Sequence, residues 1–208
     1  MCPRTRCATP DTHPSCDNGG VAKLDHVLIC GGTTREWLAS GSKIWHTQLA
    51  SLVKSVHGQG LRWLTVCPYS GTMTPTERVA LYADLIGANG GDLHHDKVSY
   101  IAAEGLMVIV DPCANGRERL VAAAARIAND VFDEEMLAAA VLAPAQSEPD
   151  LVVVLGKPNR LPQSLVWELA YSELVFLNVK WKSFNVEHLQ MAIDDFERRD
   201  RRYGGIDS

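Results

Sequence analysis

The chain has 208 residues, of which 46% are hydrophobic and 22% are charged, and its formal net charge at pH 7 is −5. This length and composition are typical of one globular domain and exclude a disordered chain, a fibrous protein and a disulfide scaffold. The acidic balance argues against a nucleic-acid binder. No apolar run approaches the roughly 18 residues of a membrane-spanning helix, and no secretory signal is visible. We therefore expect a cytoplasmic protein without a membrane span, and leave open a peripheral contact with a membrane.

Residues 1–24 are rich in Pro, Thr, Cys, Asp and Gly and have no hydrophobic period. This pattern predicts a flexible leader in front of one domain over residues 25–208. From residue 25 onward, short apolar runs rich in β-branched residues alternate with helical patterns. The predicted strands cover residues 26–30, 61–67, 98–101, 106–110, 151–155 and 174–177. The run at 151–155 is apolar on both faces, which favours a central place in a parallel sheet.

The helices are predicted from apolar residues that recur every three or four positions. Their inward stripes are Ile44, Leu49, Leu52 and Val56; Val79, Tyr82 and Ile86; Leu120, Ala124, Ile127 and Val131; and Val186, Leu189, Ile193 and Phe196. A weaker helix is expected over 134–143, and Pro162 is placed to open another that ends near Tyr171. The alternation predicts an α/β fold with a single doubly wound, mostly parallel sheet flanked by helices.

The six cysteines bear on metal binding and redox state. Three lie with His13 at spacings that match no common zinc motif, and three lie in or beside apolar runs. We therefore expect free thiols, with a zinc site in the leader as the less favoured alternative. The six are Cys2, Cys7, Cys16, Cys30, Cys67 and Cys113.

Ligands of parallel sheets bind at the carboxyl ends of the strands, so the loops there are candidate sites. The first predicted strand runs into Gly31 and Gly32, whose amides can approach an anion, and Arg35 adds a cation. The loop after the run 151–155 carries Lys157 and Arg160. Ordinary turns and a solvated loop are the alternative interpretations of these two segments.

A longer pattern includes the second of these loops. Residues 149–176 read PDLVVVLGKPNRLPQSLVWELAYSELVF, and the pattern continues through Trp181 and Phe184 into residues 198–205. This block resembles the C-terminal part of the cis-prenyltransferases, the undecaprenyl diphosphate synthase-like enzymes. Residues 26–37 resemble that family's first strand and diphosphate loop, and residues 64–70 resemble its second strand, so the resemblance covers about residues 25–205.

The resemblance implies an enzyme that condenses isopentenyl diphosphate with an allylic diphosphate. The leaving diphosphate would be stabilised by Mg²⁺, by arginines and by loop amides, and a hydrophobic tunnel would take the growing chain. Carried over position by position, it implies diphosphate-binding roles for Gly32, Arg35, His46 and Arg160. It also implies prenyl diphosphates as ligands.

The chain departs from the family pattern at positions that carry the chemistry. Gly31 stands where the family has the loop Asp that holds the metal–diphosphate, and Val154 replaces the first of two arginines. Pro162 replaces the Ser that follows the second arginine, and the Asn–Trp pair after the second strand is replaced within residues 71–75. Glu173 remains as a candidate Mg²⁺ ligand, with a structural or inter-subunit role as the alternative. The region between residues 76 and 106, which flanks the tunnel in the family, is abbreviated.

The C-terminal end retains the family's Arg-x-Gly sequence as Arg202-Tyr203-Gly204. In the family this ending reaches across a dimer into the partner's diphosphate site, so the resemblance assigns Arg202 and Gly204 a catalytic contribution there. A basic helix end that complements the helix dipole is the plainer interpretation. Lost catalytic groups with a retained ending resemble the non-catalytic subunits of heteromeric cis-prenyltransferases.

Three hypotheses follow. The chain is a degenerate subunit that pairs with a catalytic paralogue, which would hold most of the Mg²⁺, or forms a homodimer. Alternatively, it is an atypical prenyltransferase with a short or irregular product. A prenyl diphosphate-binding regulator without turnover is the third.

His94, His95 and Asp96 are interpreted as a loop at a helix end rather than as a metal site.

Overall fold

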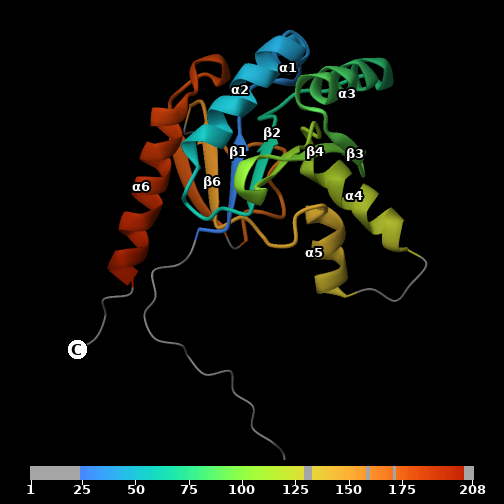
Figure 1. Ribbon diagram of the computed structural model, residues 1–208. Coiled ribbons are helices and arrows are strands. Elements are labelled where there is room, and N and C mark those ends of the chain that lie inside the picture. The colour runs from blue at the N-terminus through green and yellow to red at the C-terminus, as the bar shows by residue number, and fades with distance from the viewer. Residues whose placement is uncertain (1–23, 129–132, 158–159, 171, 204–208) are drawn as a thin grey trace, which may run out of the picture.

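The computed structural model describes residues 24–128, 133–157, 160–170 and 172–203 (Figure 1). A seven-stranded sheet with the order β3-β4-β5-β2-β1-β6-β7 forms its centre. The strands are β1 (His26–Cys30), β2 (Trp63–Cys67), β3 (Asp92–His94), β4 (Lys97–Ile101), β5 (Met107–Val110), β6 (Leu151–Leu155) and β7 (Glu173–Leu177). The predicted leader, except for Leu24, lies outside the described residues.

The five strands from β5 to β7 are parallel, and β3 and β4 form an antiparallel hairpin at one edge. The predicted mostly parallel α/β sheet is therefore confirmed. The strand run at 151–155 is buried along its whole length and lies between β1 and β7. Strands that are covered by helices on both faces require apolar residues at every position, which explains this run.

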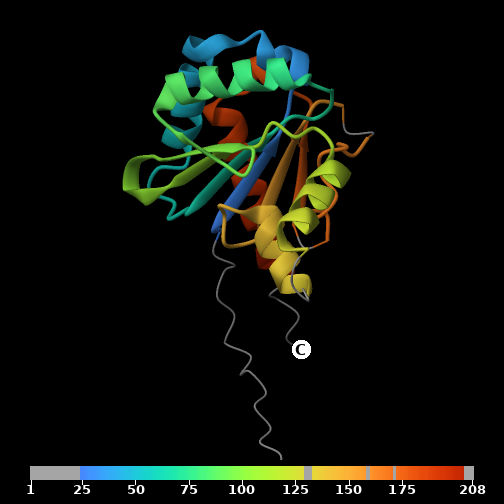
Figure 2. The ribbon, with the colours of Figure 1, turned by 90° about the vertical axis from the view of Figure 1, so that its right-hand side faces the viewer.

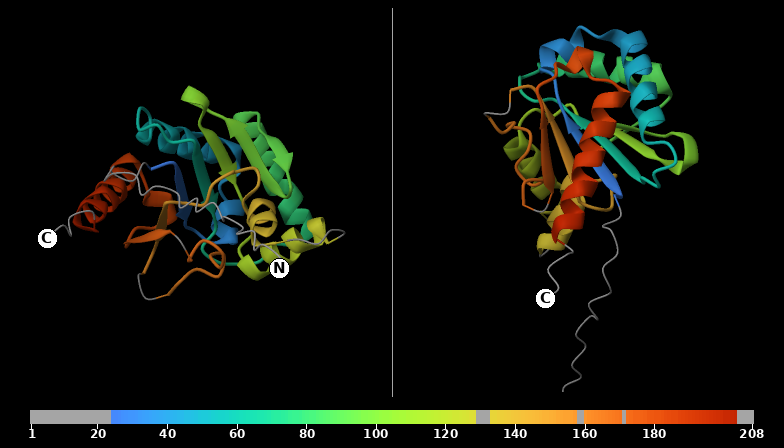
Figure 3. Two further views of the ribbon diagram at one scale, coloured as in Figure 1. Left: turned by 90° about the horizontal axis from the view of Figure 1, so that it is seen from below. Right: turned by 90° about the vertical axis from the view of Figure 1, so that its left-hand side faces the viewer.

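Helices cover both faces of the sheet (Figures 2 and 3). One face packs against α2, α3 and α6 and holds the larger core, while α4 and α5 lie on the other face. Alternate residues of β1 serve the two faces, since Val27 and Ile29 join the larger core and Leu28 and Cys30 join the smaller one. The helices are α1 (Thr34–Leu38), α2 (Gly41–Ser55), α3 (Pro75–Asn89), α4 (Gly116–Ile127), α5 (Glu134–Leu142) and α6 (Val186–Tyr203).

The predicted helix from Pro162 to Tyr171 is wrong, because the described residues 161–170 form isolated turns. Ser164 and Glu168 are fully buried and bond across to α4, where Arg119 contacts both. These tertiary contacts, rather than a helical hydrogen-bond ladder, fix the segment. Tyr171 lies outside the described residues.

Two local interpretations also need correction. The segment with His94, His95 and Asp96 is the tight turn of the β3–β4 hairpin, where His95 and Asp96 have φ of 48° and 63°, and not the end of a helix. On α4 the buried residues are Gly116, Arg119 and Ala123, and Arg119 forms ion pairs under the helix. Several residues of the predicted stripes are only half-buried or exposed. They are Ile44, Val79, Ile86, Leu120, Ala124, Ile127 and Val186.

Candidate functional site

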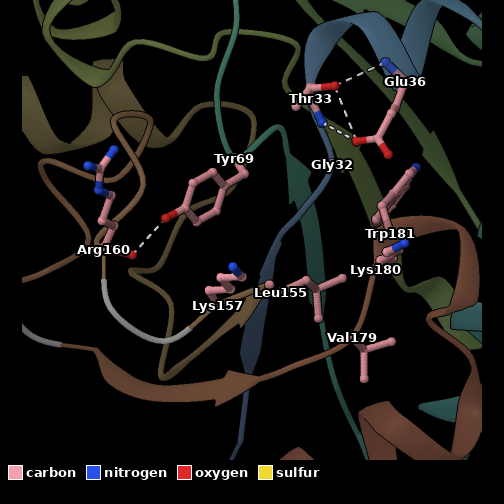
Figure 4. A pocket seen from close by; sticks show the side chains of 11 residues that line it. Gly32, Thr33, Glu36, Tyr69, Leu155, Lys157, Arg160, Val179, Lys180 and Trp181 are labelled. Carbon is pink, nitrogen blue, oxygen red and sulfur yellow. Dashed lines mark hydrogen bonds between the residues drawn. The ribbon is translucent and has the colours of Figure 1, made fainter.

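A cavity of about 460 Å³ opens at the carboxyl ends of β1, β6 and β7 (Figure 4). The loops that follow these three strands line it, together with Tyr69 from the loop after β2. The lining residues are Gly32, Thr33, Glu36, Tyr69, Leu155, Gly156, Lys157, Arg160, Val179, Lys180 and Trp181. This is the edge at which parallel sheets bind ligands.

The loop after β1 is held rigidly by its own side chains. Thr33 caps α1 by accepting from the backbone N–H of Glu36 at 3.2 Å, and the Glu36 carboxylate accepts from the N–H and the hydroxyl of Thr33 at 2.9 and 3.2 Å. The indole N–H of Trp37 donates to the Gly31 carbonyl at 2.9 Å. Glu36, the acidic side chain among the described lining residues, is therefore engaged in a structural capping box.

Neither glycine of this loop has room for a side chain. A Cβ on Gly31 would lie 2.7 Å from Cδ1 of Leu155. Gly32 has φ of +74°, and its Cβ would lie 2.9 Å from both Trp181 and Trp37. A side chain at either position would therefore crowd the cavity wall.

Trp181 lines the cavity and belongs to a cluster of three indoles. The ring centroids of Trp37 and Trp45 lie 4.9 Å apart, and each lies 5.8 Å from that of Trp181. All three rings are fully buried. Trp181 follows β7 and faces the cavity, so this cluster joins the cavity to the core between α2 and the sheet.

Three cations also line the cavity. Lys157 and Arg160 belong to the loop after β6, and Lys180 follows β7 beside Trp181 (Figure 4). All three are exposed, and no described carboxylate forms an ion pair with any of them. The Tyr69 hydroxyl donates to the Arg160 carbonyl at 2.8 Å and so anchors the end of the loop. Exposed cations around a cavity favour an anionic ligand.

The structure brings together only part of the predicted site. Gly32 and Arg160 line the cavity. Arg35 is exposed on α1 and interacts electrostatically with Glu77 at the start of α3. His46 lies on α2 and does not line the cavity. Its ring Nδ1 donates to the Ala88 carbonyl at 2.8 Å.

Glu173 and Arg202 lie at the other end of the molecule. Glu173 begins β7, at the amino end of the parallel strands, where its carboxylate lies 3.8 Å from Arg199. From that position Glu173 does not reach this chain's own cavity as a metal ligand. Its contact with Arg199 fits the alternative, a structural role. The backbone of Arg202 lies in the last turn of α6, at the same end (Figures 1 and 3). Gly204 lies outside the described residues.

Sequence reasoning missed Glu36 and Lys180. Lys180 could have been found, because it follows the carboxyl end of a predicted strand, which is the rule that singled out the loops after β1 and β6. Glu36 gave no such signal, since its spacing from Thr33 is that of an ordinary capping box.

The described residues do not fit the Mg²⁺ that the family resemblance implies. Magnesium is held in proteins by carboxylates together with substrate phosphates. The cavity offers one carboxylate, that of Glu36, whose Oε2 accepts both Thr33 bonds. Nowhere in the described part of the chain do three His, Cys, Asp or Glu side chains converge on a possible metal position. The cavity is instead lined by three cations, which would repel a bare metal ion.

A second polar cluster is buried beneath α4. Arg119 forms ion pairs with Asp111 at 3.1 Å and with Glu168, and its Nη2 donates to the Ser164 carbonyl at 3.0 Å. Lys97 lies 3.9 Å from Asp111 and donates to the carbonyls of residues 141–143 at the end of α5. Burial lowers the pKa of Lys97, and Asp111 opposes that shift. The cluster is internally paired, which is typical of a structural network.

The buried thiols of Cys30 and Cys67 lie on adjacent parallel strands. A hydrogen bond with Cys30, together with burial, raises the pKa of the Cys67 thiol well above its ordinary value. Cys67 is therefore no nucleophile at neutral pH.

Comparison with known proteins agrees with this architecture. The family model described as putative undecaprenyl diphosphate synthase matches residues 97–204, just over half of the chain. "Isoprenyl transferase 2" of Bradyrhizobium diazoefficiens is 28% identical, over 87% of this chain and 90% of that protein. A ditrans,polycis-undecaprenyl-diphosphate synthase of Lactiplantibacillus plantarum is 43% identical over 79 residues, which are 37% of this chain and 30% of that protein.

Two solved structures share the fold. Lavandulyl diphosphate synthase of Lavandula x intermedia superposes with a TM-score of 0.60 at 18% identity, over 84% of this chain and 95% of that one. A probable undecaprenyl diphosphate synthase of Campylobacter jejuni superposes with a TM-score of 0.57 at 15% identity, over 87% and 98%. From the family match and the parallel sheet with its strand-end cavity, it follows that this chain belongs to the undecaprenyl diphosphate synthase-like prenyltransferase family.

Proposed function

We propose that the chain is a degenerate cis-prenyltransferase subunit that supports prenyl diphosphate synthesis by a catalytic partner. One observation carries the proposal: the strand-end cavity has three cations for a diphosphate, while its one described carboxylate, that of Glu36, is engaged by Thr33 through Oε2. Leu155 and the tryptophans occupy the space that a side chain on Gly31 or Gly32 would need. A carboxylate at either position would therefore crowd the wall of the cavity.

The position of α6 supports a contribution in trans. This helix runs from the cavity end of the molecule to the amino end of the strands, so its last turn lies far from the chain's own cavity (Figure 1). Arg199 fastens that end to β7, because it donates to the Leu174 carbonyl at 3.2 Å and pairs with Glu173. In this proposal Arg202 and Gly204 extend from the anchored end into the partner's diphosphate site, and the partner holds the Mg²⁺ of the reaction.

Co-expression with a catalytic paralogue from the same genome tests the proposal. The purified complex should turn over isopentenyl diphosphate faster than the paralogue alone. Arg202→Ala should leave assembly intact and reduce turnover roughly a hundredfold, the usual effect of losing one charge-stabilising donor. Arg198→Ala is the matched control, since Arg198 is exposed one turn earlier and contacts residues of its own helix. Equal turnover of both variants and wild type would refute the contribution in trans.

A second candidate is an atypical prenyltransferase that acts alone on isopentenyl and allylic diphosphates. The names of the relatives, isoprenyl transferases, and the three cations of the cavity favour it. A regulator that only binds a prenyl diphosphate would share the cavity but show no effect on a partner's turnover. A homodimer is the alternative assembly, and sedimentation of the purified chain distinguishes it from a heteromer.

Within the parts of the chain that the structure describes, no helix combines the length and apolarity needed to cross a bilayer. A cytoplasmic location remains part of the proposal.

A further inference from the structure

We infer that the strand-end cavity binds the diphosphate group of its ligand directly through Lys157, Arg160 and Lys180, without a divalent metal ion. This inference rests on the proposed assignment of the cavity as a diphosphate site. It departs from the metal-bridged binding that the family resemblance implies, and it assigns two lysines to the site that the resemblance does not.

The backbone places the two lysines in loops that leave neighbouring strands of the sheet. β6 and β7 are parallel neighbours, and Leu155 is paired with Leu177 at their carboxyl ends. The Gly156 N–H donates to the Leu177 carbonyl at 2.9 Å, so the two loops leave the sheet side by side. Lys157 then follows in one loop and Lys180 in the other, and both line the same cavity.

The charge balance of the wall suits a bare diphosphate. Lys157, Arg160 and Lys180 oppose one carboxylate, that of Glu36, and this carboxylate is bonded to Thr33. A diphosphate carries two to three negative charges near neutral pH, so it can be neutralised by these side chains alone. A magnesium–diphosphate complex has less negative charge than the free diphosphate. The lining residues also provide no group of carboxylates to complete the coordination of the metal.

The anchoring of the loops supports a preformed site. Tyr69 holds the Arg160 carbonyl at 2.8 Å, and Trp181 is packed against two other indoles beside Lys180. The lysine side chains are exposed, and each lysine is next to an anchored residue: Gly156 is bonded to Leu177, and Trp181 is packed in the indole cluster. Lost side-chain entropy then remains the main cost of binding.

Calorimetric titration of the full chain with inorganic pyrophosphate and with isopentenyl diphosphate tests the inference. We expect the affinity in EDTA to equal or exceed the affinity in millimolar MgCl₂, because magnesium competes for the same phosphate oxygens. The affinity should fall as NaCl is raised. Inorganic phosphate, titrated in parallel, should bind more weakly than pyrophosphate.

Single variants identify the cations. Lys157→Met and Lys180→Met should each weaken pyrophosphate binding roughly tenfold in EDTA, with unfolding curves that match wild type. Lys182→Met is the matched control, because Lys182 is exposed two residues from Lys180 and does not line the cavity. Equal losses in all three variants, or none in any, would overturn the assignment of the lysines.

The outcomes separate the inference from the proposed function. Binding that appears only when Mg²⁺ is present would overturn the metal-free mode and leave the cavity as a diphosphate site. Absence of binding in both buffers would overturn the assignment of the cavity itself. If Mg²⁺-dependent binding were lost in Glu36→Gln, that carboxylate would be the metal ligand, and the inference would be wrong.

Discussion

Two charged regions of the molecule differ in burial and in pairing. Beneath α4, Arg119, Asp111 and Glu168 are buried and bonded to one another. At the strand-end cavity, Lys157 and Lys180 are exposed, and no described carboxylate pairs with them. The charged groups beneath α4 pair with one another, whereas the lysines of the cavity keep a positive charge that an anionic ligand can neutralise.

This difference indicates where function should be sought. A buried network of ion pairs is costly to break, because removing one partner leaves an uncompensated charge. Exposed cations around an apolar-walled cavity contribute little to folding and can bind an anion. Substitutions in the two regions should therefore act on different measured quantities, namely the free energy of unfolding and the affinity for diphosphate.

The largest effect is expected from Arg119→Met. This change leaves the buried Glu168 without its cation and Asp111 with Lys97 alone, and we expect a loss of about 3–5 kcal/mol in the free energy of unfolding. Urea denaturation followed by circular dichroism measures it. Arg117→Met, at an exposed position on the same helix, should change stability by less than about 0.5 kcal/mol. A small effect at Arg119 would mean that the network is not structural.

The second prediction concerns His26, which is buried in β1. Its Nδ1 donates to the Ser147 carbonyl at 2.7 Å, and its Nε2 accepts from the Thr65 hydroxyl at 2.8 Å. Burial lowers the pKa of His26 to about 4, although the Ser147 bond opposes the shift. The unfolded chain, with a His pKa near 6.5, therefore binds the proton more readily.

The sign of the pH dependence follows from this difference. Stability from His26 is fully present above about pH 6.5 and is lost as the pH falls towards 4, by about 3 kcal/mol in total. Urea unfolding of wild type and His26→Gln at several pH values isolates this contribution, since the other groups are common to both. Parallel pH profiles of the two proteins would contradict the prediction.

The smallest effect tests the steric account of the missing carboxylate. Gly31→Asp should destabilise the chain by about 1–3 kcal/mol, because its Cβ overpacks against Leu155. A double-mutant cycle with Leu155→Ala should show favourable coupling between the two changes. Gly87→Ala on α3 is the control, since its nearest neighbour would be 3.7 Å away. Full stability of Gly31→Asp would show that the wall can accept a carboxylate.

The sequence carried enough information for the sheet and part of the site. The apolar run of β6 and the glycines after β1 could be interpreted without the structure, and Gly32 and Arg160 do meet at one cavity. The burial of Arg119 could not be foreseen, because an arginine on a helix is usually exposed and its partner Glu168 is 49 residues away. The same long-range pairing explains why the segment after Pro162 is not helical.

Local sequence patterns could also not predict the edge hairpin or the position of Glu173. β3 consists of three exposed residues, so it has no hydrophobic alternation to reveal it. Glu173 was selected by family resemblance alone, and only the strand direction shows that it lies at the end of the sheet opposite the cavity. Spatial placement of this kind depends on topology rather than on the residues near it in the chain.

The chain has the cis-prenyltransferase fold, and the central proposal is that its cavity binds a diphosphate without catalysis of its own. Prenyl transfer by the purified chain alone tests it most directly, with Mg²⁺, labelled isopentenyl diphosphate and a panel of short allylic diphosphates. The account predicts no product above background from the chain alone and product once a catalytic paralogue is added. Chain-elongated product from the purified chain by itself would contradict the account and establish it as an atypical prenyltransferase.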